Sequence, residues 1–280
     1  MGTSLNNKLF LFSIDLEDVR FLLPDGKKFK ERVPYNTEVY LKWLDKNKFK
    51  CTFFTVGDIA EHYPALIKEI VAEGHEIACH TYRHIPLDKQ TKAEFKADLE
   101  KNINALYKAG AKKIEGFRAP IFSLTEKTQW AYAVLADLNI AYSSSVFPAK
   151  NPLYGWETFG NKIRKVNEKI IEIPMTIGRV GPLHIPYGGG VYFRMLPEFV
   201  IKSKIKNHSA ADNPLLGYFH PYDIDTEQER FMHPGINESK LYNYLMYYNR
   251  SGVFEKLDRI IEAGFTVDTY SNYIHNYLVL

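Results

Sequence analysis

The stretch CTFFTVGDIAEHYPALIKEIVAEGHEIACH, residues 51–80, contains the alternation that decides the fold. Its two ends, 51–56 and 75–80, are apolar runs of the length expected for buried strands. The segment between them, 58–74, has the apolar spacing of a helix and ends at Gly74, and Pro64 interrupts or restarts that helix. A strand, a helix and a second strand in this order predict two parallel strands joined by a crossover helix.

The same alternation continues on both sides of this stretch. We expect further strands at 9–14, 113–118, 140–147, 169–175, 215–221 and 265–270, and further helices at 37–48, 92–110, 126–139, 197–207 and 244–264. This pattern predicts an α/β protein with parallel strands covered by helices, and about eight strands favour a closed or nearly closed barrel over an open sheet. Residues 148–166 and 178–196 are expected to be long loops, which are often functional.

The composition is that of an ordinary globular protein. The chain has 280 residues, of which 45% are hydrophobic and 25% charged, and this length suits one domain spanning residues 1–280. Its net charge of +3 comes from scattered residues, so we expect no nucleic-acid partner. Cys51 and Cys79 lie in predicted strands, which indicates buried free thiols and a cytoplasmic location. The apolar run at 9–12 is too short for a signal peptide or a membrane span.

Polar residues follow the ends of several predicted strands. In parallel barrels the active site gathers where the strands have their carboxyl ends, so these residues are candidates for one site. They are Asp15, Glu17 and Asp18 after the first strand, His80 and His84 after the third, Arg118 after the fourth, Ser143, Ser144 and Ser145 in the fifth, and His220 after a late strand.

The segment HTYRH, residues 80–84, places two imidazoles four positions apart. On one helical turn this spacing would put both rings on the same side. Two imidazoles and a carboxylate form a ligand set for Zn²⁺ or another divalent ion, with positions left for water and substrate. The alternative is that His80 only ends a strand and His84 lies on the surface. The acidic run at 15–18 and the distant His220 favour the metal site.

The ordered motifs resemble a known family. SIDLED, TFFTVGDIAEHYP, GHEIACHTYRH, GFRAPIF, SSSVFP and YFHPYDID are similar to the motifs of polysaccharide deacetylases of the NodB-homology type, also called carbohydrate esterase family 4. The resemblance covers about residues 9–225, and GGGVYFRMLP is typical of the branch associated with exopolysaccharide and O-antigen gene clusters. It implies a distorted (β/α)7 barrel and hydrolysis of the N-acetyl amide of a sugar with one divalent metal.

The resemblance also implies roles for single residues. Asp15 matches the general base, Arg118 the arginine that holds this base, and His220 the general acid. His80 and His84 match the metal histidines, and Asp18 best matches the metal aspartate. In the family the two aspartates of the first motif are usually adjacent, whereas here Leu16 and Glu17 intervene, so Glu17 is a rival ligand.

Four residues are candidates for substrate binding, and one position departs from the family. The candidates are Pro120, Phe122, Ser144 and Tyr222, with a backbone N–H near Ser144 or Ser145 expected to hold the oxyanion. The branch commonly has YDSS where this chain has YSSS, so Ser143 replaces the aspartate that tunes the acid histidine. A catalytically inactive sugar-binding descendant therefore stays open.

These observations predict a metal-dependent carbohydrate N-deacetylase. Zn²⁺ is the expected metal, although Co²⁺, Ni²⁺ or Fe²⁺ would also fit the ligands. The expected partner is a carbohydrate with an N-acetyl group, in a polysaccharide or in its lipid- or nucleotide-linked precursor. A deformylase or another C–N amide hydrolase is the alternative enzyme. Peripheral contact with a membrane and the oligomeric state stay open.

Overall fold

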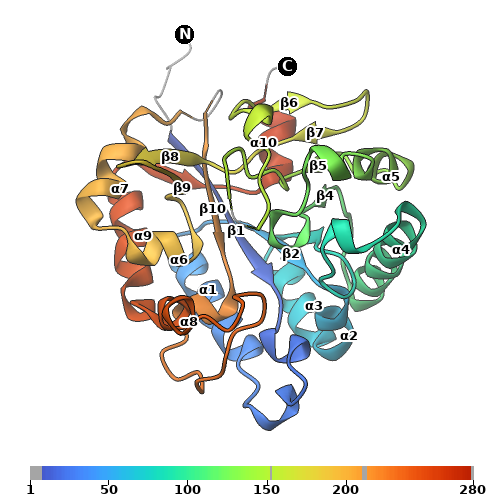
Figure 1. The fold of residues 1–280 in the computed structure, drawn as a ribbon, viewed down its shortest axis with the longest axis horizontal. Coiled ribbons are helices and arrows are strands. Elements are labelled where there is room, and N and C mark those ends of the chain that lie inside the picture. Colours follow the sequence, from blue (N-terminus) through green and yellow to red (C-terminus); the bar gives the residue numbers. More distant parts are fainter. Residues whose placement is uncertain (1–7, 152, 210–212, 279–280) are drawn as a thin grey trace.

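The centre of the molecule is a curled sheet (Figure 1). The computed structural model describes residues 8–151, 153–209 and 213–278. The strands of the sheet follow the order β10-β1-β2-β3-β4-β5-β7-β6, and β11 pairs with β1. Every pairing in this sheet is parallel except that of β6 with β7. A separate antiparallel hairpin is formed by β8 and β9.

The strands are short apart from the first. Their bounds are β1 (Lys8–Leu16), β2 (Thr52–Thr55), β3 (Glu76–Cys79), β4 (Gly116–Phe117), β5 (Tyr142–Ser143), β6 (Arg164–Lys165), β7 (Ile171–Glu172), β8 (Ile177–Val180), β9 (Leu183–Pro186), β10 (Leu215–Phe219) and β11 (Phe265–Val267).

Most helices lie around the outside of the sheet (Figure 1). Their bounds are α1 (Val33–Lys46), α2 (Gly57–His62), α3 (Pro64–Ala72), α4 (Lys92–Ala109), α5 (Ala131–Asp137), α6 (Gly190–Met195), α7 (Glu198–Lys204), α8 (Lys240–Tyr247), α9 (Val253–Glu262) and α10 (Tyr270–Asn276). None of the helices among the described residues has the length and apolar character needed to cross a bilayer.

Strand β1 lies in the middle of the architecture. It pairs with β10 on one side and with β2 on the other, and after Lys8 all its residues are buried. Phe10, Phe12 and Ile14 belong to one hydrophobic cluster, while Leu9 and Leu11 belong to a second. Because successive side chains of a strand point to opposite faces, β1 joins the two clusters into the core around which the sheet curls.

Most predicted elements are confirmed. Helix α3 begins at Pro64, and one residue separates it from the end of α2. Helix α4 begins with a capping box between Thr91 and Glu94 and is followed by Gly110 in the left-handed conformation. The curled sheet with outer helices confirms the predicted α/β barrel in a distorted form. Cys51 and Cys79 are buried and free, as predicted.

Three predictions about elements were wrong. The expected loop at 178–196 contains most of the β8–β9 hairpin and the helix α6. The expected helix at 244–264 is broken, because Asn249 takes a φ of 49° between α8 and α9. In the expected loop at 148–166, the residues Arg164–Lys165 form β6.

Candidate metal centre and active site

The predicted polar residues lie at the carboxyl ends of three strands, around one cleft. β1 ends at Leu16 beside Asp15 and Glu17, β3 ends just before His80, and β10 ends just before His220. A cavity of about 430 Å³ lies among them, lined by Asp15, Glu17, His80, His84, Phe122, Phe147, Tyr192, Arg194, Tyr218, His220, Tyr222, Asp223 and His233, among others. The carboxyl ends of parallel strands meet at one edge of the sheet, which is why residues far apart in the chain converge here.

Glu17, His80 and His84 form a compact cluster. One potential ligand atom of each lies within 4.8 Å of the others, and Oε2 of Glu17 is 2.8 Å from Nε2 of His84. Although burial opposes it, the neighbouring His84, followed by His220, holds the pKa of Glu17 well below its usual range. Burial lowers the pKa of His80 to about 4, so this imidazole is neutral at pH 7.

The cluster fits a divalent metal. Nδ1 of His80 lies 2.8 Å from the carbonyl oxygen of Arg118, so Nδ1 carries the proton and Nε2 keeps a free lone pair. Oε2 of Glu17 is buried and has no hydrogen-bond partner of ordinary geometry among the described residues. A buried oxygen without such a partner, next to two imidazoles, is the donor set that Zn²⁺ accepts.

Asp18, predicted as the metal aspartate, lies outside the cluster. Its carboxylate accepts hydrogen bonds from Nη2 of Arg20 at 2.6 Å and from the backbone N–H of Arg20 at 3.0 Å. Asp15 and Glu17 share a side of β1 because strand side chains alternate, whereas Asp18 is the residue that caps the following 3-10 helix. The predicted position of Asp18 is therefore wrong, and its rival Glu17 lies beside the histidines.

The two histidines do not lie on a helical turn. Thr81 and His84 have φ values of 62° and 56°, in the left-handed region, so the segment 80–84 is an irregular loop. The loop nevertheless brings the two rings to 4.9 Å between centroids. The predicted neighbourhood of the two imidazoles is thus present, although the predicted helical reason for it was wrong.

Arg118 holds Asp15 below the cluster. Its side chain is fully buried, and Nη1 donates to Oδ1 of Asp15 at 2.6 Å and to Oγ of Ser13 at 2.8 Å. Burial lowers the pKa of Arg118, but the charge of Asp15 outweighs this and keeps the guanidinium charged. Oδ2 of Asp15 lies 4.0 Å from Nε2 of His80, so the second carboxylate oxygen faces the cluster.

His220 lies next to the Glu17 member of the cluster, whereas Asp15 lies next to His80. Nε2 of His220 lies 3.8 Å from Oε1 of Glu17, and its ring stacks on Tyr222 with 4.6 Å between centroids. Nδ1 lies 2.9 Å from Oδ2 of Asp223. Burial works against it, but the hydrogen bond and charge of Asp223, followed by the charge of Glu17, raise the pKa of His220 to about 9.

Asp223 is the residue that sequence reasoning missed. A carboxylate partner for His220 was sought at position 143, where the chain has a serine whose hydroxyl donates instead to Ser145 at 2.7 Å. Asp223 lies three residues after His220, in HPYD, and its side chain and that of His220 form a capping box on the short helix Pro221–Ile224. That His-x-x-Asp spacing was the available signal.

Two predicted substrate-binding residues lie away from the cavity. Ser144 is buried under the site, where its carbonyl oxygen accepts from Nε of Arg118 at 3.1 Å and its N–H donates to the carbonyl oxygen of Phe117 at 2.9 Å. The N–H of Ser145 donates to Glu172 at 2.7 Å. Neither N–H is therefore free for an oxyanion, and that expectation was wrong. Pro120 is also buried and is not among the lining residues, which include Phe122 and Tyr222.

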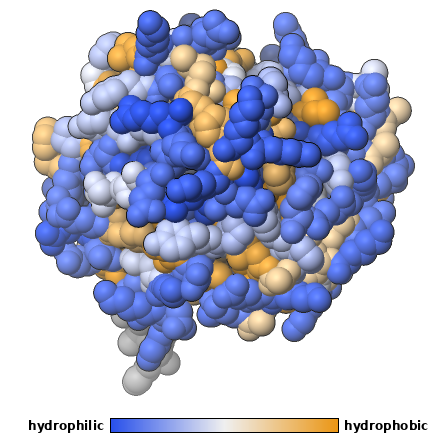
Figure 2. Space-filling view, turned by 90° about the horizontal axis from the view of Figure 1, so that it is seen from below, coloured by the Kyte–Doolittle hydropathy of each residue, from blue (hydrophilic) through white to orange (hydrophobic). Residues whose placement is uncertain are grey.

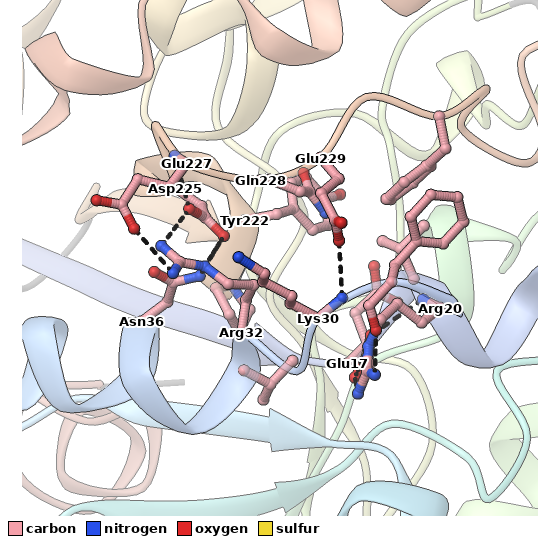
Figure 3. Close-up of a pocket in the computed structure, with 16 residues that line it drawn as sticks. Glu17, Arg20, Lys30, Arg32, Asn36, Tyr222, Asp225, Glu227, Gln228 and Glu229 are labelled. Atoms are coloured by element: carbon pink, nitrogen blue, oxygen red, sulfur yellow. Dashed lines mark hydrogen bonds and ion pairs between the residues drawn. The ribbon is translucent and has the colours of Figure 1, made fainter. Parts of the chain in front are cut away.

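Two ion pairs and a hydrogen bond link two loops next to the cavity. In Figure 3, Arg32 lies between Asp225 at 2.7 Å and Glu227 at 3.0 Å, and the backbone N–H of Lys30 donates to Glu229 at 2.8 Å. These contacts join the loop after β1 to the loop after β10 around a small pocket of about 20 Å³.

The surface seen from below is mixed in character (Figure 2). It is mostly hydrophilic, and its hydrophobic residues form separate patches. The cavity itself combines the charged cluster with apolar and aromatic walls that include Phe122, Phe147 and Tyr218. Such walls suit the flat apolar faces of a sugar ring beside a few oriented polar groups.

Comparison with known sequences divides the chain into two matched regions. Residues 25–141 match the polysaccharide deacetylase family, and residues 144–275 match a domain of unknown function (DUF3473). A peptidoglycan-N-acetylglucosamine deacetylase of Bacillus cereus is 32% identical over 96 residues, which are 34% of this chain and 35% of that protein. A chitooligosaccharide deacetylase of Bradyrhizobium sp. is 39% identical over 61 residues, which are 22% of this chain and 28% of that protein. The chain thus matches about a third of these relatives' length.

Solved structures match almost the whole chain. The peptidoglycan deacetylase PdaC of Bacillus subtilis has a TM-score of 0.53 at 11% identity, over 96% of this chain and 91% of that one. A CE4 family pseudoenzyme of Bacillus anthracis has a TM-score of 0.52 at 13% identity, over 98% of this chain and 68% of that one. At this identity the likeness concerns the fold alone, and it confirms the distorted (β/α)7 barrel.

Proposed function

We propose that this chain, whose residues 25–141 match the polysaccharide deacetylase family, is a metal-dependent hydrolase that removes an N-acetyl group from an amino sugar. The observation that supports this most directly is the cluster of Glu17, His80 and His84, with Asp15 at 4.0 Å from His80 and His220 at 3.8 Å from Glu17. Those three side chains would hold one divalent ion, with Zn²⁺ the first choice for one carboxylate and two imidazoles.

In the proposed reaction, Asp15 accepts one proton and His220 donates another. A bound divalent ion would lower the pKa of water and polarise the acetyl carbonyl. Asp15, which is paired with Arg118 at 2.6 Å, accepts a proton from the attacking water as the new C–O bond forms. His220 gives its proton to the sugar nitrogen as the C–N bond breaks. Acetate and a free amine leave the cleft.

Aromatic walls of the cavity would orient the sugar. Phe122 and Tyr222, two of the four predicted substrate-binding residues, line the cavity, and Tyr222 is stacked on His220. A sugar ring packed on these side chains would place its acetamido group at the cluster. The catalytic residues come from both matched regions and from the segment before them, so we propose a single catalytic unit that spans the chain.

The substrate we propose is a cell-surface glycan or its lipid- or nucleotide-linked precursor. The order of the motifs and the segment GGGVYFRMLP support the branch associated with exopolysaccharide and O-antigen synthesis. The proposal keeps the cytoplasmic location expected above, which is supported by two buried thiols that form no disulfide.

Acetate release from an N-acetylated oligosaccharide tests this function. With Zn²⁺ and tetra-N-acetylchitotetraose, the wild-type chain is expected to release acetate, and Asp15→Asn and His80→Ala are expected to reduce the rate at least about 100-fold. The N-formylated tetramer distinguishes a deformylase, which would release formate but no acetate. Failure to hydrolyse either amide, with Zn²⁺ bound, would contradict the proposal and leave a sugar-binding protein.

A further inference from the structure

A buried row of three charged side chains lies behind the proposed proton donor. It runs from His220 at the cavity to Asp223 and then to Arg194, and both Asp223 and Arg194 are 1% exposed. We propose that Asp223, anchored by Arg194, is the positioning residue that fixes His220 as the proton donor to the leaving nitrogen. All three residues lie in the region 144–275, so this inference assigns that region the acid half of the site. It rests on the proposed deacetylase function.

Asp223 fixes both the ring and the backbone of His220. Its Oδ2 lies 2.9 Å from Nδ1 of the imidazole and accepts a hydrogen bond from the backbone N–H of His220 at 2.8 Å. Because Nδ1 is engaged by the carboxylate, Nε2 is the nitrogen that faces the cavity. The stacking of Tyr222 at an interplanar angle of 9° leaves the ring little freedom to turn.

Arg194 forms an ion pair with the other oxygen of the carboxylate. Its Nε lies 3.0 Å from Oδ1 of Asp223. Its Nη1 donates to the carbonyl oxygens of Leu245, Met246 and Tyr248 at 3.3, 3.1 and 2.6 Å, at the carboxyl end of α8. A helix carries a partial negative charge at this end, which stabilises a buried guanidinium. Helix α6, which carries Arg194, is linked to α9 by hydrogen bonds from Lys256 to the carbonyl oxygens of Phe193 and Arg194, both at 2.9 Å.

This row explains how His220 can have a carboxylate partner although Ser143 replaces the aspartate of the family motif. A serine cannot balance the charge of an imidazolium, whereas a carboxylate can. The charge of Arg194 and the hydrogen bonds from His220 outweigh burial and lower the pKa of Asp223 to about 2, so the carboxylate is ionised at every working pH. The carboxylate that the family resemblance places on the fifth strand is thus supplied three residues after the histidine itself.

Asp225 offers a matched control for the test. It belongs to the same turn, is 2% exposed, and forms an ion pair with the partly buried Arg32 at 2.7 Å (Figure 3). It has no contact with His220 among the contacts of the described residues. Replacing Asp225 by Asn therefore removes a buried carboxylate and its ion pair without changing a direct partner of the proposed proton donor.

The test compares two substrates that differ in the leaving group. Tetra-N-acetylchitotetraose releases an amine that must be protonated, whereas 4-nitrophenyl acetate releases a stable phenolate that needs no proton. We expect Asp223→Asn to lower kcat for the amide at least about 100-fold and to change ester hydrolysis less than about threefold. Asp225→Asn is expected to change both rates by the same factor. Should Asp223→Asn fail to fold, Asp223→Glu, which keeps the charge but moves the carboxylate, is measured in the same way.

The possible outcomes separate this inference from the proposed function. Equal losses on the two substrates in Asp223→Asn, or no loss on the amide, would overturn the positioning role while leaving the deacetylase proposal intact. A wild-type chain that binds Zn²⁺ and hydrolyses neither amide nor ester would overturn both. An amide-selective loss confined to Asp223 variants supports the inference.

Discussion

Glu17 and Asp18 are neighbours in the chain, but their carboxylates have different partners. Glu17 lies 2.8 Å from His84, whereas Asp18 is bound to Arg20 at 2.6 Å. We expect Glu17→Gln to weaken Zn²⁺ binding at least about tenfold, because it removes the anionic ligand. Asp18→Asn is expected to keep the affinity within about threefold and to lower stability, because it leaves Arg20 without its buried partner. Isothermal titration calorimetry measures both affinities, and the reverse order of effects would contradict the assignment of the cluster.

The sequence predicts single site residues unevenly. That Asp15, His80, His84, Arg118 and His220 lie close together could be predicted, because each belongs to a recognisable motif near the carboxyl end of a strand. The choice between Glu17 and Asp18 could not, because it depends on where β1 ends and on which side its last residues face. Asp223 and Arg194 could not be joined from the sequence, because the contact between them spans 29 positions and two elements.

His75 predicts a pH dependence of stability outside the active site. Its buried Nδ1 accepts a hydrogen bond from the N–H of Cys51 at 3.2 Å, and Lys50 and Glu73 lie nearby. Burial, with a smaller contribution from Lys50, lowers its pKa from 6.5 to about 4. The unfolded chain therefore binds more protons between these values, and the stability that neutral His75 provides is full above pH 6.5 and is lost as the pH falls through 4.

The loss can be measured by urea unfolding between pH 4 and 7. The wild-type chain is expected to lose roughly 3 kcal/mol from this residue, and His75→Gln is expected to flatten that part of the profile. His184→Gln, at an exposed position on β9, is the control that should keep the wild-type slope. An unchanged slope in His75→Gln would show that other groups cause the pH dependence.

At the scale of elements, the run Gly188–Gly189–Gly190 allows α6 to begin directly against β10. A Cβ at Gly189 would lie 2.1 Å from the carbonyl oxygen of Tyr218, and Gly190 has a φ of 61°. We expect Gly189→Ala to lower the free energy of unfolding by about 3 kcal/mol, because two backbones must move apart. Gly181→Ala, where φ is 59° and nothing lies within 4 Å, is expected to cost only about 1 kcal/mol of backbone strain. Similar losses in both variants would contradict the close approach.

Elements were predictable where local signals and tertiary packing agree. Helix α4 combines amphipathic spacing with a capping box at Thr91 and a terminal Gly110, so the sequence alone fixes its ends. Helix α6 begins at the last of three consecutive glycines, which by themselves favour a loop. Its position depends on the contacts that Arg194 makes with distant residues. The break at Asn249 was hidden because apolar spacing continues on both sides of it.

At the scale of the whole molecule, β1 unites the two matched regions. It pairs with β2, from the region 25–141, and with β10, from the region 144–275. The base side of the proposed site, Asp15 with Arg118, thereby faces the acid side, His220 with Asp223, across one cavity. A curled parallel sheet is the feature that allows this, because it gathers the ends of distant strands at one edge.

The central claim is that Glu17, His80 and His84 hold one divalent ion between Asp15 and His220. The most direct measurement is an anomalous difference map at the zinc absorption edge, from crystals of the full chain grown with Zn²⁺. We predict one strong peak in the cleft, in contact with all three side chains. A peak at Asp18, or no peak in the cleft of a protein whose side chains are arranged as described, would contradict the account.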